Sequence, residues 1–352
     1  MGKRLLFITP MFPKNKSEDV VVPFITHFSE EFANSTDVQV DILSLMFPIS
    51  KDYFFDKIKV YTIGSGYKRN FRMIPYLIKA VLKGTYLNRK KKYDGILCFW
   101  YGHSALIGKM ISIIPKTQQA VWMLGQDVRK GNRFLNWIKV SPHQIVMVSH
   151  QQRDIFFKNH NIYVQKIANV AINPKRFPKI NKNKREIDII GVGNLSPLKN
   201  YSLFIDIIHA LIKEFPDISV ILCGGDGEDK KLLLKKVNDF DLTNNIKFIG
   251  TVPHKKVLDL MNNTSVLLHT SKFEGNPTVV QEALYSGCQV ISTIPMEGGS
   301  EIDTFYYSIS KVEIINKIKS ILNNQNFLAQ RTEKFKMTDT INVIYKTFFN
   351  DS

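Results

Sequence analysis

The sequence contains few of the features that mark secreted or metal-binding proteins. Its 352 residues include only three cysteines, Cys98, Cys223 and Cys288, which lie too far apart along the chain to suggest a disulfide framework. Each lies in or beside an apolar, strand-like run, so we interpret them as reduced core residues in a reducing compartment. The sequence also lacks the spacing of metal ligands, and we expect no bound metal.

Long hydrophobic runs are missing as well. The longest apolar region, residues 96–115, is interrupted by His103, Lys109 and two glycines, and it predicts a strand, a turn and a helix instead of a membrane span. The N-terminal run at residues 5–9 is too short for the core of a signal peptide, and no cleavage site of small residues follows it. The expectation is a soluble protein of the cytoplasm.

Negative charge is scarce, because 48 Lys and Arg residues outnumber 31 Asp and Glu and give a formal net charge of +17. Many basic residues gather in one stretch: Lys57, Lys59, Lys68, Arg69, Arg72, Lys79, Lys83, Arg89, Lys90, Lys91 and Lys92. Apolar residues interleave there at roughly helical spacing: Phe71, Ile74, Leu77, Ile78, Val81 and Leu82. A basic amphipathic stretch suits an anionic membrane surface, which would place the protein peripherally on the inner face of the cell membrane. A core helix with a solvated Lys-rich face explains the pattern equally well, whereas no motif supports nucleic acid as a partner.

Short apolar runs alternate with longer periodic segments, which predicts parallel sheets with crossover helices. In the first half we expect strands at residues 5–9, 38–43, 58–62, 95–99, 119–122 and 144–148, and helices at 23–33, 73–82, 104–113 and 151–159. After a polar, Lys-rich stretch a second series follows, with strands at 187–192, 218–223, 246–249, 265–270 and 288–293, and helices at 201–215, 229–237 and 255–261. We therefore expect an α/β protein of two domains, with a boundary between residues 171 and 186 and a last helix at 338–349.

The segment from Glu274 to Glu282 carries the clearest chemistry in the sequence. It lies between two strand-like runs, at a position where open α/β sheets bind ligands. Asn276 is a good N-cap and Pro277 suits the first helical position, so the amides of residues 278–280 would point outward as a phosphate cradle. A phosphate between two carboxylates suggests a sugar nucleotide. A charged loop followed by a solvated helical Glu explains the same spacing.

Three other strand-like runs end in loops that contain glycine. One loop runs from Gly193 to Lys199, whose ammonium could neutralise a phosphate. A Gly-rich turn occupies residues 224–227, and residues 251–253 could line a base pocket. Each segment alone is explained equally well by ordinary turn chemistry. Taken together they are informative, because the carboxyl ends of parallel strands meet at one sheet edge.

The order of these segments resembles the donor domain of the retaining glycosyltransferases of the GT-B fold, the large family 4 of glycosyl transferases group 1. That pattern has a G-R-L…K-G loop, a G-x-G strand end, an F-x-G strand end and an S-x-x-E-G…E-A…G unit. It appears here as Gly193-Asn194-Leu195…Lys199-Asn200, Gly225-Asp226-Gly227, Phe248-Ile249-Gly250 and Ser271-Lys272-Phe273-Glu274-Gly275…Glu282-Ala283…Gly287. The resemblance covers about residues 187–293, and Asn194 stands where the family usually has Arg.

The resemblance implies two Rossmann-like domains that face each other across a cleft. The N-terminal acceptor-binding domain would span residues 1–172, and the nucleotide-sugar-binding domain residues 173–335. A C-terminal helix within residues 336–352 would cross back to the first domain.

The resemblance also implies roles for single residues. Glu274 would contact the hydroxyl groups of the transferred sugar, Glu282 would bind the ribose, and Lys199 would neutralise the diphosphate. His103 stands where the family often has a His that contacts the donor sugar, although a surface or capping His fits equally well. Asp127 lies in a loop that resembles one at the cleft, with no assigned role. The remaining donor contacts would come from Gly193, Asn194, Thr251, Val252, Asn276, Pro277, Thr278 and Val279.

The implied activity is transfer of a sugar, with retention and without a metal or other cofactor. The donor would be a nucleotide diphosphate-sugar, with UDP-sugar favoured, and the acceptor a glycan or lipid-linked glycan in surface polysaccharide synthesis. Alternatives are a GT-B phosphorylase, a sucrose-type synthase, or a partner subunit without turnover. The last is suggested by Asn194, which replaces the family's usual Arg. The presence of Glu274, Lys199 and Glu282 favours an active enzyme.

Overall fold

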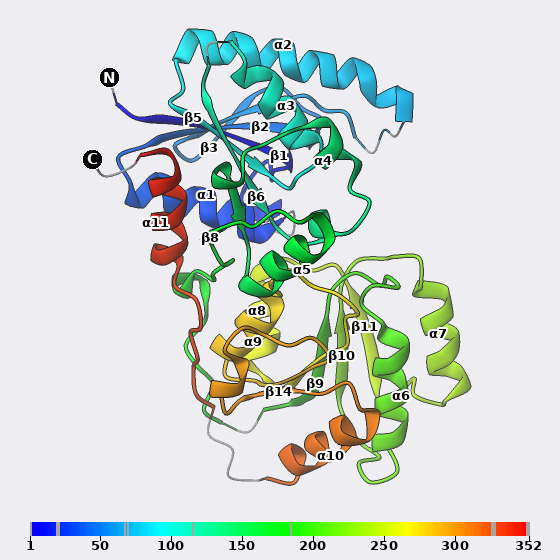
Figure 1. Cartoon of the computed structure of the whole chain (residues 1–352). Coiled ribbons are helices and arrows are strands. Elements are labelled where there is room, and N and C mark those ends of the chain that lie inside the picture. The colour runs from blue at the N-terminus through cyan, green and yellow to red at the C-terminus, as the bar shows by residue number, and fades with distance from the viewer. Residues whose placement is uncertain are drawn as a thin grey trace. The chain divides into compact units, whose positions relative to one another are not determined.

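The computed structural model describes residues 2–18, 22–66, 68, 70–114, 116–183, 185–324 and 329–349, without the side chains of Ser17 and Asn70. Arg69 and Pro115, which belong to segments singled out above, lie outside these residues. The chain divides into two compact units, Met1–Ala171 with Phe335–Ser352 and Ile172–Lys334. Each unit is built on its own largely parallel sheet (Figure 1), which confirms the predicted class of two Rossmann-like α/β domains.

The first unit has a sheet with the strand order β3-β4-β2-β1-β5-β6-β7-β8. Its strands are β1 (Arg4–Met11), β2 (Gln39–Phe47), β3 (Tyr53–Phe55), β4 (Ile58–Thr62), β5 (Gly95–Phe99), β6 (Gln118–Met123), β7 (Ile145–Met147) and β8 (Lys166–Ile167). Only the β3–β4 pair in the described sheet is antiparallel. Residues 5–8 of β1 are fully buried, as expected for a parallel strand that is covered on both faces.

The helices of the first unit are α1 (Pro23–Ser35), α2 (Ile74–Lys91), α3 (His103–Ser112), α4 (Arg133–Trp137), α5 (His150–His160) and α11 (Met337–Phe348). α2 and α3 lie on one face of the sheet, and α1 and α11 lie on the other (Figure 1). The C-terminal helix belongs to this unit because Met337, Ile341 and Ile344 are buried in its core. The Thr340 hydroxyl also donates to the Asn169 carbonyl over 2.7 Å.

The second unit has a fully parallel sheet in its described residues, with the order β11-β10-β9-β12-β13-β14. Its strands are β9 (Ile187–Val192), β10 (Val220–Cys223), β11 (Ile246–Gly250), β12 (Thr264–His269), β13 (Gln289–Ser292) and β14 (Phe305–Tyr307). Its helices are α6 (Tyr201–Leu211), α7 (Lys230–Asp239), α8 (His254–Asn262), α9 (Thr278–Tyr285) and α10 (Lys311–Leu322). α6, α7 and α10 share one apolar core, while α8 and α9 cover the other face with a second.

The longest departure from the expected elements is α2, which continues to Lys91 instead of ending near residue 82. Gly84 lies inside it where α3 packs closely, since a Cβ there would lie 2.2 Å from Cδ1 of Ile111. The edge strands β3, β8 and β14 were not anticipated, because two or three residues are too few to show an alternating pattern. α4 and α10 were missed as well, although Ser310 and Glu313 form a recognisable cap at the start of α10.

All three cysteines are buried and unpaired, which confirms their interpretation as core residues. Burial raises the pKa of the Cys98 thiol to about 12 and that of Cys223 to about 11. Among the helices formed by the described part of the chain, none is long and apolar enough to cross a membrane.

Candidate active site

The loops that follow β9, β10 and β11 are joined directly at the carboxyl edge of the second sheet. The amide of Gly224 donates to the Gly250 carbonyl over 3.0 Å, and the amide of Gly225 donates to Oδ1 of Asn194 over 3.2 Å. A Cβ on Gly224 would lie only 1.9 Å from the Gly193 carbonyl oxygen, so only glycine permits this approach. The structure therefore brings these glycine-containing loops together at one edge.

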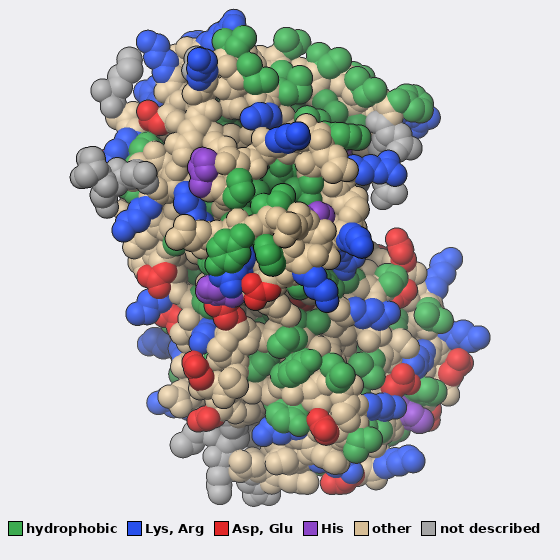
Figure 2. All heavy atoms as spheres, in the orientation of Figure 1, with side chains coloured by type: hydrophobic (Ala, Val, Ile, Leu, Met, Phe, Trp, Pro, Cys, Tyr) green, Lys and Arg blue, Asp and Glu red, His purple; other side chains and the backbone are tan. Residues whose placement is uncertain are grey.

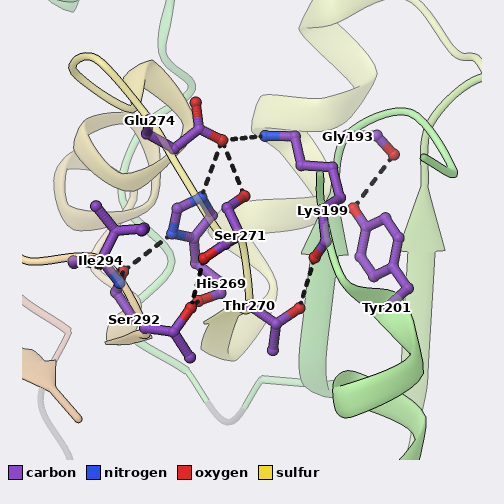
Figure 3. A network of polar contacts seen from close by, with 10 residues as sticks. Gly193, Lys199, Tyr201, His269, Thr270, Ser271, Glu274, Ser292 and Ile294 are labelled. Atoms are coloured by element: carbon purple, nitrogen blue, oxygen red, sulfur yellow. Dashed lines mark hydrogen bonds and ion pairs between the residues drawn. The ribbon is translucent and has the colours of Figure 1, made fainter. Parts of the chain in front are cut away.

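Glu274 and Lys199 form an ion pair at this edge (Figure 3), with 2.7 Å between Lys199 Nζ and Glu274 Oε1. The Ser271 hydroxyl donates to the same carboxylate oxygen over 2.8 Å. The Lys199 side chain passes over Gly193, where a Cβ would lie 2.7 Å from Lys199 Cε. Gly193 is thus needed so that the ammonium can reach the loop that follows β12.

His269, the last residue of β12, is a site residue that the sequence analysis missed. Its Nδ1 lies 2.9 Å from the Ser292 hydroxyl, and its Nε2 lies 3.6 Å from Glu274 Oε1 (Figure 3). Burial lowers the pKa of His269, so the ring is neutral at neutral pH and Lys199 supplies the positive charge beside Glu274. A His at the strand end, five residues before the Glu, was the available signal.

The Glu274 carboxylate is held in its charged form. Burial alone would raise its pKa, but the neighbouring His269 ring and the charge and hydrogen bond of Lys199 outweigh burial and lower the pKa of Glu274 to about 2. The group therefore stays ionised over the whole physiological pH range. A permanently charged acceptor suits binding of hydroxyl groups better than donation of a proton.

We expect the stability that Glu274 provides to be fully present above its ordinary pKa of 4.5 and to disappear as the pH falls towards about 2. A lowering of this size corresponds to about 3 kcal/mol of unfolding free energy at neutral pH. Urea unfolding of the wild type and of Glu274→Gln protein measures it. The difference should be constant from about pH 5 to 8 and shrink near about pH 3.5. A difference that varies between pH 5 and 8 would contradict the assignment.

Glu282 is buried inside α9 and paired with a second histidine that the sequence analysis missed. Its Oε1 lies 2.8 Å from Nε2 of His254, the first residue of α8, and both side chains are about nine-tenths buried. Glu282 is therefore not a solvated helical Glu. The signal for His254 was its place directly after the loop of residues 251–253.

The helix after Glu274 begins one residue later than expected. Pro277 is the N-cap of α9, with φ −71° and ψ 101°, and its side chain makes no cap hydrogen bond. Asn276 precedes this cap position, and its Oδ1 accepts from Nε2 of Gln281 over 2.7 Å. The prediction that Asn276 caps and Pro277 opens the helix is wrong, because the ψ of Pro277 lies outside the helical range. Pro277 has no amide hydrogen, so the first-turn donors are those of Thr278 and Val279.

Thr251 and Val252 follow β11 at the same edge of the sheet. Thr251 is exposed, and a Cβ on Gly225 would lie 2.9 Å from its hydroxyl oxygen. Val252 packs partly against the core under α8 and α9. No group of three or more His, Cys, Asp or Glu suited to a metal ion occurs in the part of the chain that the structure describes.

Two further candidate residues lie in the first unit. His103 opens α3, is exposed, and has its ring edge-on to Phe134 with 5.0 Å between the centroids. The Asp127 carboxylate accepts the amides of Tyr101 and Gly125, both over 2.9 Å. Asp127 therefore ties the loop after β6 to the loop that leads into α3, which is a structural role.

Residues 173–336 match the family model described as glycosyl transferases group 1. The second unit is a group 1 glycosyltransferase domain. The Glu274–Lys199 pair and the joined glycine loops lie within the matched residues.

Curated relatives match about half of the chain. It is 24% identical over 184 residues to the GPI3 subunit of phosphatidylinositol N-acetylglucosaminyltransferase from Saccharomyces cerevisiae, covering 50% of this chain and 40% of that protein. It is 26% identical over 165 residues to the amylovoran biosynthesis glycosyltransferase AmsD of Erwinia amylovora, covering 45% of each. The chain spans less than half the length of these relatives.

Solved structures match nearly the whole chain and show its fold. TarM aligns with a TM-score of 0.75 at 12% identity, covering 98% of each chain. Sucrose-phosphate synthase from Thermosynechococcus elongatus aligns with a TM-score of 0.73 at 13% identity, covering 98% of this chain and 95% of that one. Anabaena HepE in complex with UDP and glucose aligns with a TM-score of 0.66 at 15% identity, covering 98% and 95%. The fold is that of GT-B glycosyltransferases.

Proposed function

We propose that this protein is a retaining, family 4-like glycosyltransferase that moves a hexose from a nucleotide diphosphate-sugar to a glycan or lipid-linked acceptor in surface polysaccharide synthesis. The observation that carries the proposal is the Glu274–Lys199 ion pair at the carboxyl edge of the second sheet. UDP is the favoured nucleotide, because the similar structures of TarM and HepE were solved with UDP.

In the proposed reaction the bond between the sugar C1 and the diphosphate oxygen breaks, and this oxygen keeps the electron pair. The acceptor hydroxyl oxygen bonds to C1 on the same face, and its proton passes to the leaving diphosphate. The energetic problem is the negative charge of the leaving group. Lys199 stabilises this charge, since an ammonium has three N–H donors and only one of them is needed for Glu274. The amides of Thr278 and Val279 add the partial positive charge of a helix N-terminus.

The remaining candidates take supporting parts in the proposal. Glu274 accepts hydroxyl groups of the transferred sugar, and Glu282, held by His254, accepts those of the ribose. Thr251 and Val252 flank the base, and the family resemblance alone makes His103 a further candidate for the donor sugar. The acceptor is assigned to the first unit, and no metal or cofactor takes part.

A partner subunit without turnover is the second candidate. Asn194 favours it, because its side chain accepts the Gly225 amide and brings no charge to a diphosphate. One relative is itself named as a subunit of its enzyme. The charged pair of Lys199 and Glu274 favours catalysis. A phosphorylase would instead turn over sugar phosphates without a nucleotide.

The deciding experiment is a thermal-shift screen of the purified chain with UDP-, GDP-, ADP- and dTDP-sugars, followed by a transfer or hydrolysis assay with the best donor. A donor at 100 times its Kd adds about 2.7 kcal/mol of stability, which is a readily measured shift. Donor binding with turnover supports the enzyme, and binding without turnover supports the partner subunit. The absence of a shift with every donor would reject the nucleotide-sugar site.

We expect His254→Ala protein to bind the donor nucleotide about tenfold more weakly, which is about 1.4 kcal/mol, because the buried Glu282 loses the group that orients it. Calorimetric titration with UDP measures the Kd, and kcat should change less. His209→Ala is the matched control, since His209 stacks on Phe240 in the same unit away from the strand-end loops. Equal Kd values for wild type and His254→Ala would remove His254 from the site.

A further inference from the structure

An exposed apolar stripe runs along the outer face of α2. Ile74, Ile78, Leu82 and Tyr86 follow one another at four-residue intervals and are 52–67% exposed. Phe71, just before the helix, is 73% exposed. These hydrophobic side chains cover the outer side of α2 in Figure 2. A stripe of this spacing occupies one side of a helix over about 18 Å.

The inner side of α2 explains why the stripe points outward. The residues that α2 buries against the unit are mainly small or polar, Ala80, Gly84 and Asn88, together with Leu87. Gly84 allows α3 to approach closely, and Leu77 and Val81 are half-buried beside it. The core-helix interpretation of this stretch therefore does not account for Ile74, Ile78 and Leu82.

The neighbouring helix α3 extends the apolar surface. Met110, Ile113 and Ile114, at and just after its C-terminal end, are 49–59% exposed. The two helices are held together by the contact of Gly84 with Ile111 and by the amide of Asn88, which donates to the Thr117 hydroxyl over 2.9 Å. We call the exposed residues Phe71, Ile74, Ile78, Leu82, Tyr86, Met110, Ile113 and Ile114 the α2–α3 face.

The two helical segments that carry the α2–α3 face have charges of one sign. Residues 70–92 and 103–119 contain neither Asp nor Glu. Their exposed cations are Arg72, Lys79, Arg89, Lys90, Lys92, Lys109 and Lys116. Beside Ile113, an open hollow of about 440 Å³ is lined by Lys109, Ser112, Lys116 and His143, which suits a phosphate head group.

We propose that the α2–α3 face docks on a bilayer surface rich in anionic lipid, with its apolar residues between the head groups and its cations against them. Apolar burial and attraction to anionic lipid are the two contributions that hold interfacial helices on membranes. A face with exposed cations, whose two helical segments contain neither Asp nor Glu, is complementary to such a surface. Docking would bring the enzyme to a lipid-linked acceptor. This purpose rests on the proposed function, whereas the docking itself does not.

The test is flotation of the full chain with vesicles of phosphatidylcholine alone or with about 30% phosphatidylglycerol. The wild type should bind the anionic vesicles at about 50 mM NaCl and lose more than tenfold in partition at about 500 mM NaCl or without anionic lipid. Ile78→Ser with Leu82→Ser should lower the partition at least tenfold. Arg89→Gln with Lys90→Gln should lower it by about 30-fold, because each charge near the surface contributes about 1 kcal/mol and two charges are removed.

The matched controls lie on α7 of the second unit. Leu232→Ser with Leu234→Ser removes two leucines that are 60% and 43% exposed, and Lys230→Gln with Lys231→Gln removes two cations. Both control variants should bind vesicles like the wild type. The proposal is overturned if the wild type does not bind anionic vesicles at low salt. It is also overturned if Ile78→Ser/Leu82→Ser protein binds them like the wild type. If the wild type does not bind vesicles but forms a dimer in ultracentrifugation, and Ile78→Ser/Leu82→Ser protein is a monomer, the face belongs to a contact with a second copy instead.

Donor binding separates this proposal from the proposed function. The thermal shift with the UDP-sugar should be the same in the wild type and in the α2 variants. Wild-type protein that shows the donor shift but does not bind anionic vesicles would reject docking alone. Wild-type protein that binds the vesicles without any donor shift would reject the glycosyltransferase function alone.

Discussion

Glu274→Gln protein is expected to transfer sugar about 10²–10³-fold more slowly than the wild type. The substitution keeps the shape of the side chain but removes the charge that Lys199 and Ser271 hold in place. An amide accepts hydroxyl groups more weakly than a carboxylate, because charge-assisted hydrogen bonds are roughly twice as strong as neutral ones. The measurement is kcat with the nucleotide sugar that gives the largest thermal shift.

Glu186→Gln is the matched control for this prediction. Glu186 is an exposed carboxylate directly before β9, at the amino edge of the same sheet, so its loss should leave kcat unchanged. Circular dichroism of both variants checks that the second unit is folded. A wild-type rate for Glu274→Gln protein would remove Glu274 from catalysis.

Lys199→Met protein is expected to lose a similar factor of about 10²–10³ in kcat, because the leaving diphosphate then lacks its nearest side-chain cation. Lys199→Arg should recover part of the rate, since the charge is kept but the guanidinium is larger and planar. The double variant with Glu274→Gln should lose less than the product of the two single losses, because the groups are in direct contact. Single-turnover rates at saturating donor give all three values.

Lys319→Met serves as the control for the cation. Lys319 lies on α10, pairs with Glu214, and belongs to the same unit. Its removal deletes an ion pair but should leave donor turnover unchanged. Multiplicative losses in the double variant would show that Lys199 and Glu274 act separately, contrary to the geometry.

The sheets were predictable from the sequence because buried parallel strands are short, continuous apolar runs. β4, β5 and β9 have the bounds that their sequence predicts. The edge strands β3, β8 and β14 have no such run, since they are short and covered less completely. The length of α2 was not predictable from Gly84, because the packing of Ile111 against this glycine is a long-range contact.

For the candidate site, the order of the loops along the chain placed Gly193, Lys199 and Glu274 at one sheet edge. The pairing of Lys199 with Glu274 needed the fold, because the two residues are 75 positions apart. His269 and His254 lie beside segments that the sequence singles out, but position alone does not tell a ligand-site His from a core His. Only the fold shows that each ring lies against a carboxylate, Glu274 for His269 and Glu282 for His254.

The sequence by itself determined the fold class and the order of the strand-end loops, because both depend on local periodicity and on the rule that parallel strands end at one edge. Only the tertiary structure decided which partners the two carboxylates have and which side of α2 is covered. Periodicity shows that a helix has an apolar side, but not whether anything packs against it. On α2 the packed side consists mainly of Ala80, Gly84, Leu87 and Asn88, and the larger apolar side remains exposed.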